Sequence, residues 1–370
     1  MDAIELTRQL VRFDTRNPPG NEDACVRFVA DRLRAAGFDV QTYEFAQGRT
    51  NLIVRGRSPS DRPPLCLSGH LDTVPLGEAP WTRDPLAGTI VGDRLYGRGA
   101  SDMKSGVAAM VTAACTRGPR PEVCLVLTAG EENGCEGARY LAARGLLPER
   151  LGALVVGEPT ANVPLVGHKG VLWMEIEVTG RTAHGSAPEL GDNAVYKAAR
   201  LIRRLEGWTF AEKPHPVLGS PTLSVGMLHG GLNINSVPDR AVISLDIRTI
   251  PGVDHDALRE AVARCSDVPV EIRTLADMAS VASDPADAWI RQVFDVVEKR
   301  TGERPVPRGA AYFTDAAALR SAGQAPPTVI LGPGEPSQAH QTDEFVRLPN
   351  IEAAVAIYTD IIRAWCEEKF

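Results

Sequence analysis

The sequence predicts an α/β fold in which a catalytic domain is interrupted by a small inserted α+β domain. Helical and strand-like segments alternate over residues 1–170, and this alternation returns from Ala286 onward. Between these two parts, the elements follow a different order. Several short apolar runs end in loops that carry histidine or carboxylate side chains, which is typical of the ligand-binding edge of an open sheet.

The first part of the chain begins with two segments of helical spacing, residues 4–13 and 22–36. The run Asn17-Pro18-Pro19-Gly20 separates them, and Asn21 is the expected cap of the second helix. The further elements expected here are strands at residues 40–45 and 51–54 and a helix at residues 105–115. Small side chains dominate that last helix, so we expect it to pack closely on a sheet.

The middle of the chain has the order strand, helix, strand, strand, helix, strand. This order predicts a ferredoxin-like α+β unit. Its expected elements are residues 171–178, 193–205, 223–228, 241–248, 255–263 and 268–273. We therefore expect a discontinuous catalytic domain at residues 1–170 and 281–370, and an inserted domain at residues 171–280.

Composition and charge exclude several classes of function. The net charge of −7 argues against a nucleic-acid partner. No apolar run approaches the roughly 20 residues that span a bilayer, so no membrane partner is expected. The N-terminus lacks the basic and apolar regions of a signal peptide. The seven cysteines form no C-x-x-C pair, which favours free thiols in a reducing cytoplasm.

Four apolar runs, at residues 65–67, 123–127, 154–156 and 329–331, precede the chemically informative loops. These loops are Gly69-His70-Leu71-Asp72, Gly130-Glu131-Glu132, Gly157-Glu158-Pro159 and Ala339-His340-Gln341. Strands of an open parallel sheet place the loops that follow them at one edge, where ligands bind. Imidazole nitrogen and carboxylate oxygen are both good zinc ligands. The combination indicates a metal-dependent enzyme.

Each of these motifs has an ordinary alternative when it stands alone. His70 and Asp72 lie on one side of a strand end, where a carboxylate can orient a ligating histidine, but two unrelated surface residues would look the same. Asp102 lies at the start of the small-residue helix and could be its cap. The adjacent carboxylates of Glu131 and Glu132 repel each other unless a cation or a shared proton reduces the repulsion. The alternative is that the pair lies in an ordinary exposed acidic loop. Cys66 is near the motif, but its neighbours favour a core position.

Taken together, the motifs resemble those of the dinuclear zinc amidohydrolases and metallopeptidases, the family of acetylornithine deacetylase, succinyl-diaminopimelate desuccinylase, aminoacylase and glutamate carboxypeptidase. The resemblance runs over nearly the whole chain. It is carried by residues 68–75, 97–104, 128–132 and 157–160. It implies a mixed-sheet, zinc-exopeptidase-like catalytic domain with an inserted lid and dimerisation domain, and it implies a homodimer.

By this resemblance, Asp102 bridges two divalent metal ions, for which zinc is favoured over cobalt or manganese. His70 and Glu158 complete one metal site, and Glu132 and His340 complete the other. Glu131 is the expected general base, and Asp72 is the expected partner of His70.

The inserted domain supplies the remaining expected site residues. By resemblance, His184 polarises the scissile carbonyl, often across a dimer interface, and Asn233 and Arg248 bind substrate. The planar fork of an arginine suits a free α-carboxylate. Without the resemblance, His184 would be a surface histidine and Arg248 a charge at a strand end. Lys169 or His168 could approach the substrate, or act as hinge or surface residues.

Near Ala310 the chain departs from the desuccinylases, which tend to have a Gly-Thr-Ser-Asp type sequence there. Tyr312 and Phe313 replace small residues, while Thr314 and Asp315 keep the polar pair. This departure weighs against a strict preference for a succinyl group.

The expected function is hydrolysis of the amide bond of an N-acyl amino acid, with Glu131 moving the proton. The nearest alternative is a metallo-carboxypeptidase or dipeptidase that acts on a short peptide through the same two-metal site. A non-catalytic binding protein of this fold is the alternative from another class. It would have lost the base or a ligand, yet every expected position is filled.

Overall fold

The computed structural model describes residues 1–56, 62–320 and 325–367. The chain forms two compact units. Unit 1 comprises Met1–Gly167, Ala282–Gly309 and Thr314–Phe370, and unit 2 comprises His168–Val281 and Ala310–Phe313. The separate catalytic and lid roles expected for the two parts of the chain stay predictions.

Unit 1 is built on a six-stranded mixed sheet with strand order β1-β2-β6-β3-β7-β14. Its strands are β1 (Asp39–Ala46), β2 (Arg49–Arg55), β3 (Leu65–His70), β6 (Val123–Thr128), β7 (Ala153–Val156) and β14 (Thr328–Ile330). Neighbours from β6 to β14 are parallel, whereas β1, β2 and β6 pair antiparallel. Because β3, β6 and β7 are parallel neighbours, the loops after them meet at one edge of the sheet, as predicted.

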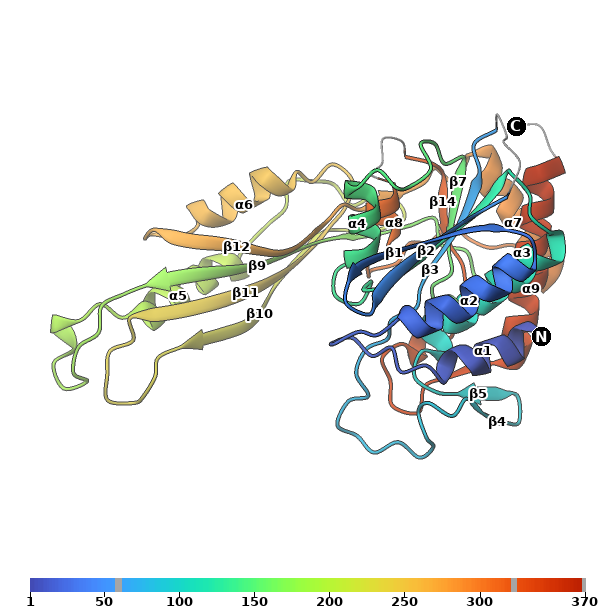
Figure 1. Ribbon diagram of the computed structural model, residues 1–370. Coiled ribbons are helices and arrows are strands. Elements are labelled where there is room, and N and C mark those ends of the chain that lie inside the picture. The colour runs from blue at the N-terminus through green and yellow to red at the C-terminus, as the bar shows by residue number, and fades with distance from the viewer. Residues whose placement is uncertain (57–61, 321–324, 368–370) are drawn as a thin grey trace. The chain divides into compact units, whose positions relative to one another are not determined.

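Helices cover both faces of this sheet (Figure 1). They are α1 (Ala3–Val11), α2 (Asp23–Ala35), α3 (Ser105–Arg117), α4 (Glu136–Ala143), α7 (Ala288–Thr301), α8 (Ala316–Leu319) and α9 (Leu348–Glu367). The predicted close packing of the small-residue helix is confirmed at α3. A Cβ at Gly106 would lie 2.2 Å from the carbonyl oxygen of Gly157, so only glycine fits at this position.

One local prediction is wrong, and one sheet was missed. Asn21 does not cap α2: the N-cap residue is Glu22, whose side chain makes no capping bond and instead accepts hydrogen bonds from Arg49. A second, three-stranded sheet was not predicted. It contains β4 (Thr89–Val91), β5 (Arg94–Tyr96) and β15 (Phe345–Arg347) in the order β15-β5-β4.

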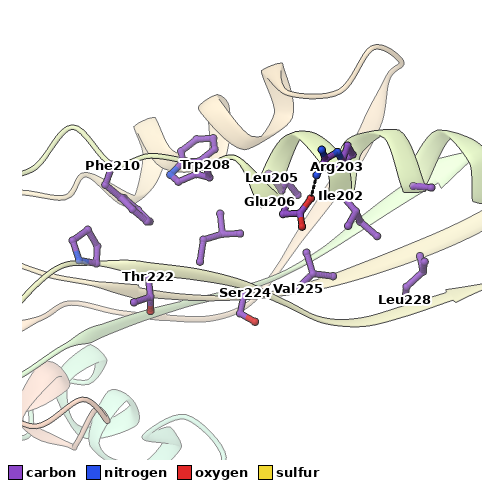
Figure 2. A pocket seen from close by; sticks show the side chains of 13 residues that line it. Ile202, Arg203, Leu205, Glu206, Trp208, Phe210, Thr222, Ser224, Val225 and Leu228 are labelled. Carbon is purple, nitrogen blue, oxygen red and sulfur yellow. Dashed lines mark hydrogen bonds and ion pairs between the residues drawn. The ribbon is translucent and has the colours of Figure 1, made fainter.

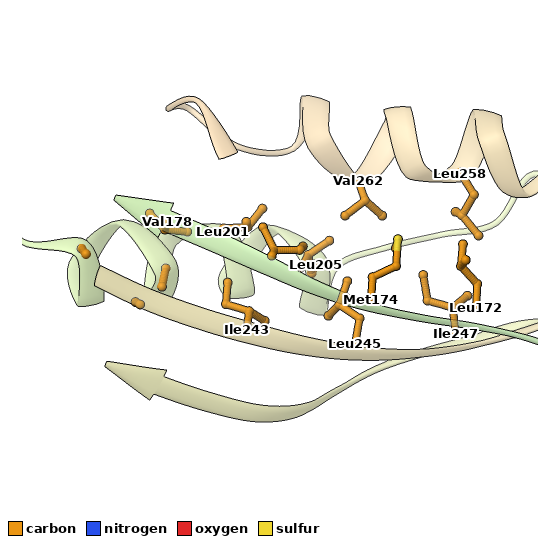
Figure 3. Packing of buried hydrophobic residues seen from close by; sticks show 14 residues of the cluster. Leu172, Met174, Val178, Leu201, Leu205, Ile243, Leu245, Ile247, Leu258 and Val262 are labelled. Carbon is orange, nitrogen blue, oxygen red and sulfur yellow. The ribbon is translucent and has the colours of Figure 1, made fainter. Parts of the chain in front are cut away.

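Unit 2 contains an antiparallel four-stranded sheet with strand order β10-β11-β9-β12. Its elements are β9 (Gly170–Thr179), α5 (Ala194–Glu206), β10 (Thr222–Gly230), β11 (Arg240–Thr249), α6 (His255–Arg264) and β12 (Val270–Met278). Both helices pack on one face of the sheet through a shared apolar core (Figure 3). That core contains Leu172, Met174, Leu201, Ile243, Leu245 and Val262.

The chain passes between the units at two short strands, β8 (Gly167–His168) and β13 (Val281–Ala282). The segment Ala310–Phe313 also belongs to unit 2, although the sequence places it in the catalytic domain. The reason is local pairing, since the backbone N–H of Lys169 donates to the carbonyl of Ala310 at 3.0 Å.

The predicted α/β class with a mixed sheet is confirmed. Among the described residues, no helix has both the length and the apolar character that a bilayer crossing requires.

Candidate metal centre and active site

His70, Asp102 and Glu158 form the first of two groups of side chains in unit 1 that are close enough together to hold a metal ion. His70 ends β3, and its Nε2 lies 3.2 Å from Asp102 Oδ1 and 3.8 Å from Glu158 Oε2. A Cβ at the preceding Gly69 would lie 2.7 Å from Met103 Cε and 2.9 Å from Val107 Cγ2, so a larger residue here would displace these side chains. The histidine and Glu158 are almost fully buried.

Asp102, Glu132 and His340 form the second group. The Nε2 of His340 lies 3.2 Å from Glu132 Oε2 and 3.5 Å from Asp102 Oδ2. Asp102 therefore belongs to both groups and directs one carboxylate oxygen toward each histidine. The two groups contain the residues that the family resemblance assigns to the two metal sites, and their role as ligands stays a prediction.

The chemistry of these side chains fits two divalent cations. Four carboxyl groups, those of Asp102, Glu131, Glu132 and Glu158, share the site with only two imidazoles. Burial raises the pKa of Glu158 to about 8, and hydrogen bonds to Asp102 and Glu132 raise the pKa of His340 to about 10. These raised pKa values reflect a concentration of negative charge that two divalent ions would balance. Glu132 Oε1 is buried and has no hydrogen-bond partner among the described residues.

Asp102 is not a helix cap, because α3 begins only at Ser105. Asp102 lies in the preceding segment Ala100–Lys104 and has non-helical backbone angles, with φ −116° and ψ 95°. The buried carboxylate of Glu344 holds this segment in place. It accepts the backbone N–H of Gly99 at 2.9 Å, of Ser101 at 2.8 Å and of Asp102 at 3.0 Å.

Glu344 is a residue that sequence reasoning missed. Its side chain is fully buried and also accepts a hydrogen bond from Arg98 Nη1 at 2.8 Å. The only signal in the sequence is its place four residues after His340, which alone indicates nothing. The structure shows that one carboxylate orients the backbone of Asp102, the residue common to both groups.

Asp72 organises the loop that carries Glu131 and Glu132. Its Oδ1 accepts the backbone N–H of Glu131, and its Oδ2 accepts the backbone N–H of Glu132, each at 3.1 Å. The Nδ2 of Asn17 donates to the same Oδ2 at 3.0 Å. Toward His70 the contact is looser, because Nδ1 of that ring lies 3.6 Å from Asp72 Oδ1 and 3.0 Å from the Asp72 carbonyl.

Glu131 lies beside the two ligand groups without belonging to either. Its side chain is buried, and this burial raises its pKa well above the usual value; the neighbouring carboxylates of Glu158, Glu132 and Asp315 add to the effect. A carboxyl group with a raised pKa in a metal site is suited to accept and return a proton near neutral pH. Its predicted role as base remains a prediction.

The other predicted site residues, His184, Asn233 and Arg248, all belong to unit 2. His184 is exposed, and its Nδ1 lies 2.7 Å from Ser186 Oγ. The His184 segment pairs with the end of the Asn233 loop, since the N–H of Gly185 donates to the carbonyl of Asn235 at 2.7 Å. Arg248 lies near the end of β11 and is half-buried.

Comparison with known proteins gives one family. The model of peptidase family M20/M25/M40 matches residues 66–364. Acetylornithine deacetylase from Vibrio cholerae serotype O1 is 31% identical over 383 residues, covering 99% of this chain and 97% of that protein. A probable succinyl-diaminopimelate desuccinylase from Staphylococcus epidermidis is 29% identical over 406 residues, covering 99% and 98%.

Solved structures of low sequence identity share the fold. An M20 family metallo-carboxypeptidase from Sulfolobus solfataricus superposes with a TM-score of 0.80 at 17% identity, covering 99% of both chains. A dinuclear metal-binding peptidase of the M20 family from Bacillus subtilis has a TM-score of 0.71 at 16% identity, covering 97% of this chain and 96% of that one.

Proposed function

Because this chain belongs to peptidase family M20/M25/M40, and is therefore a hydrolase of amide bonds, we propose that its substrate is an N-acyl amino acid. Supporting this, the relatives that align over nearly the full chain include proteins named acetylornithine deacetylase and probable succinyl-diaminopimelate desuccinylase. The products would be a carboxylic acid and a free amino acid.

The observation that carries this proposal is the shared position of Asp102 between two ligand groups, with Glu131 beside them. We propose that His70, Asp102 and Glu158 hold one divalent ion and that Asp102, Glu132 and His340 hold the other. The mixture of nitrogen and oxygen donors favours zinc. When bound, such ions would polarise the scissile carbonyl and lower the pKa of water.

In the proposed reaction, Glu131 removes a proton from the attacking water and delivers it to the departing nitrogen. Its burial supports this role because burial raises the pKa of the carboxyl group, which favours uptake of a proton from water. Asp72 holds the backbone of Glu131 and Glu132 together, so the base and the adjacent ligand keep a fixed spacing. His184 is the proposed donor to the developing oxyanion.

Asn233 and Arg248 are the proposed substrate-binding residues, with Arg248 taking the free α-carboxylate. A C-terminal residue of a peptide carries the same carboxylate. A metallo-carboxypeptidase or dipeptidase using this machinery is therefore the second candidate function.

We also propose that the enzyme is a homodimer formed through unit 2. The outer strand β10 pairs only with β11 among the described strands and exposes Met227 and Leu228. Between this strand and α5 lies a largely apolar cleft of about 810 Å³, lined by Ile202, Trp208, Phe210, Val225 and Leu228 (Figure 2). An edge strand beside apolar surface suits pairing with a second copy.

The exposed loop at Asn233 suits the same arrangement. Leu232 and Ile234 flank Asn233 and are 98% and 103% exposed, so a partner subunit would give them a place to pack. A cytoplasmic location is proposed as well, and it is supported by seven cysteines that are all free.

A substrate panel tests the proposed function. The purified protein, loaded with zinc, cobalt or manganese, is assayed for amine release from N-acetyl, N-succinyl and N-formyl amino acids beside dipeptides and tripeptides. Glu131→Gln serves as the inactive control. Faster release from N-acyl amino acids supports the proposal, whereas hydrolysis of peptides alone favours the second candidate.

A further inference from the structure

Trp173, Asp246 and Arg248 form a contiguous group on the sheet face of unit 2 that is opposite its helices. Asp246 of β11 lies directly opposite Trp173 of β9, and Arg248 follows two residues later on the same face. The intervening neighbours Leu172 and Ile247 point the other way, into the core beneath α5 and α6. The group therefore lies outside the packed core.

The Asp246 carboxylate joins the other two side chains. Its Oδ1 accepts the indole N–H of Trp173 at 2.9 Å and lies 2.9 Å from Arg248 Nε. Its Oδ2 accepts Arg248 Nη2 at 3.1 Å. The guanidinium carbon lies 5.8 Å from the centre of a ring of the Trp173 side chain, and Phe313 packs edge-on against the same side chain.

This arrangement uses only one edge of the guanidinium. The Nε–Nη2 edge is bonded to Asp246, whereas Nη1 of Arg248 donates to no residue that the structure describes. A guanidinium has a second edge, formed by its two terminal nitrogens, which also matches a carboxylate. Asp246 thus fixes Arg248 by one edge and leaves the other for a ligand.

Charge in the neighbourhood also favours an anion. The ion pair of Asp246 with Arg248 is neutral, but Lys169 adds a second cation. Burial lowers the pKa of Lys169, and the nearby Arg248 cation lowers it further, which places the two cations close together. The Lys169 ammonium donates to the carbonyl of Ser220 at 2.6 Å.

We propose that Asp246 is a positioning residue that presents the end of the Arg248 guanidinium to the α-carboxylate of the substrate. The indole of Trp173 fixes Asp246 in turn. This inference rests on the proposed function of Arg248. It attributes the enzyme's expected preference for a substrate with a free α-carboxylate over the α-carboxamide to Trp173, Asp246 and Arg248 acting together. An ordinary exposed ion pair would contribute little and would have no such preference.

The test compares an N-acetyl amino acid with its α-carboxamide. N-acetyl-L-ornithine and its α-carboxamide are the first pair. Asp246→Asn should raise KM for the acid about 10-fold, because a hydrogen-bonded charge partner is lost, and should change kcat less than about 2-fold. The kcat/KM for the carboxamide should change less than about 2-fold. Trp173→Phe should also raise KM for the acid, by a smaller factor.

Two further variants separate positioning from folding. Asp239→Asn removes a carboxylate charge just before β11, and it should leave kcat and KM unchanged for both substrates. Asp246→Asn introduced into Arg248→Ala should add no further loss for the acid, because Asp246 acts only through Arg248. Equal losses for acid and carboxamide, or a further loss in the double variant, would overturn the proposal.

Failure of the proposed function gives a different pattern. If zinc-loaded wild type hydrolyses no N-acyl amino acid, that function is wrong, and calorimetric binding of the unhydrolysed acid and carboxamide then tests Asp246 alone. Tighter binding of the acid that disappears in Asp246→Asn supports positioning. An unchanged preference, or no preference in the wild type, contradicts it.

Discussion

The carboxylate of Asp72 accepts the backbone N–H of Glu131 at 3.1 Å, and its second oxygen does the same for Glu132. One buried side chain, two residues after β3 ends, therefore fixes the loop after β6. In the proposed mechanism, Glu131 moves a proton and Glu132 holds a metal ion. Asp72 then fixes the position of the proposed base, Glu131, relative to the proposed metal ligand, Glu132.

Asn17 should matter for catalysis although it is far from the motifs in sequence. It donates to Asp72 and accepts a hydrogen bond from Asn133 Nδ2 at 2.6 Å. Asn17→Ala removes a hydrogen bond to a buried carboxylate, so we expect kcat to fall about 10-fold. Metal content measured by mass spectrometry should stay at the wild-type level. Loss of metal without loss of kcat per bound metal would contradict this role.

Glu344→Gln should destabilise the protein by about 3–5 kcal/mol, because it leaves the buried guanidinium of Arg98 without its charge partner. It should also weaken metal binding, since the same carboxylate orients the backbone of Asp102. Urea unfolding and a competition titration with a chelator measure the two effects. Glu335→Gln, on the more exposed loop before Pro336, is the matched control and should be close to wild type.

Metal removal should lower the thermal stability of unit 1. Without cations, the carboxyl groups of Asp102, Glu132 and Glu158 remain close together in a buried site. Rebinding at a free metal concentration about 1,000 times the dissociation constant should restore about 4 kcal/mol. Calorimetric scans of chelated and zinc-reloaded protein measure this. Superimposable scans would show that the metal does not bind the folded site.

His184 should act across the proposed dimer. His184→Ala and Glu131→Ala chains should each be nearly inactive. Heterodimers of the two should recover part of the activity, because one site then carries both lesions and the other carries neither. Assays after proven subunit exchange measure the recovery. No recovery would indicate that His184 acts within its own chain or not at all.

The sequence was informative where a strand ends in reactive side chains. The apolar runs before His70, Glu131 and Glu158 are buried strands of one sheet, and their loops meet as predicted. Local periodicity also indicated the two helices and four strands of unit 2. These features are visible in sequence because each is set by neighbouring residues.

Long-range contacts were not visible. Glu344 and Asp102 are far apart in the chain, and nothing in the sequence near either residue indicates that the Glu344 carboxylate accepts the backbone N–H of Asp102. Asn17 looked like part of a chain-breaking turn, although its side chain bonds Asp72. The three-residue strands β4, β5 and β15 are too short to show a period. Asp102 precedes a helix without being its cap, and only the backbone angles reveal this.

The most direct test of the central claim compares Glu131→Gln with Glu132→Gln in metal content and in turnover. We expect two divalent ions per chain in the wild type and in Glu131→Gln, with kcat of that variant lowered about 10²–10⁴-fold. Glu132→Gln should lose one of the two ions. Equal metal loss in both variants, or full activity in Glu131→Gln, would contradict the assignment of base and ligand.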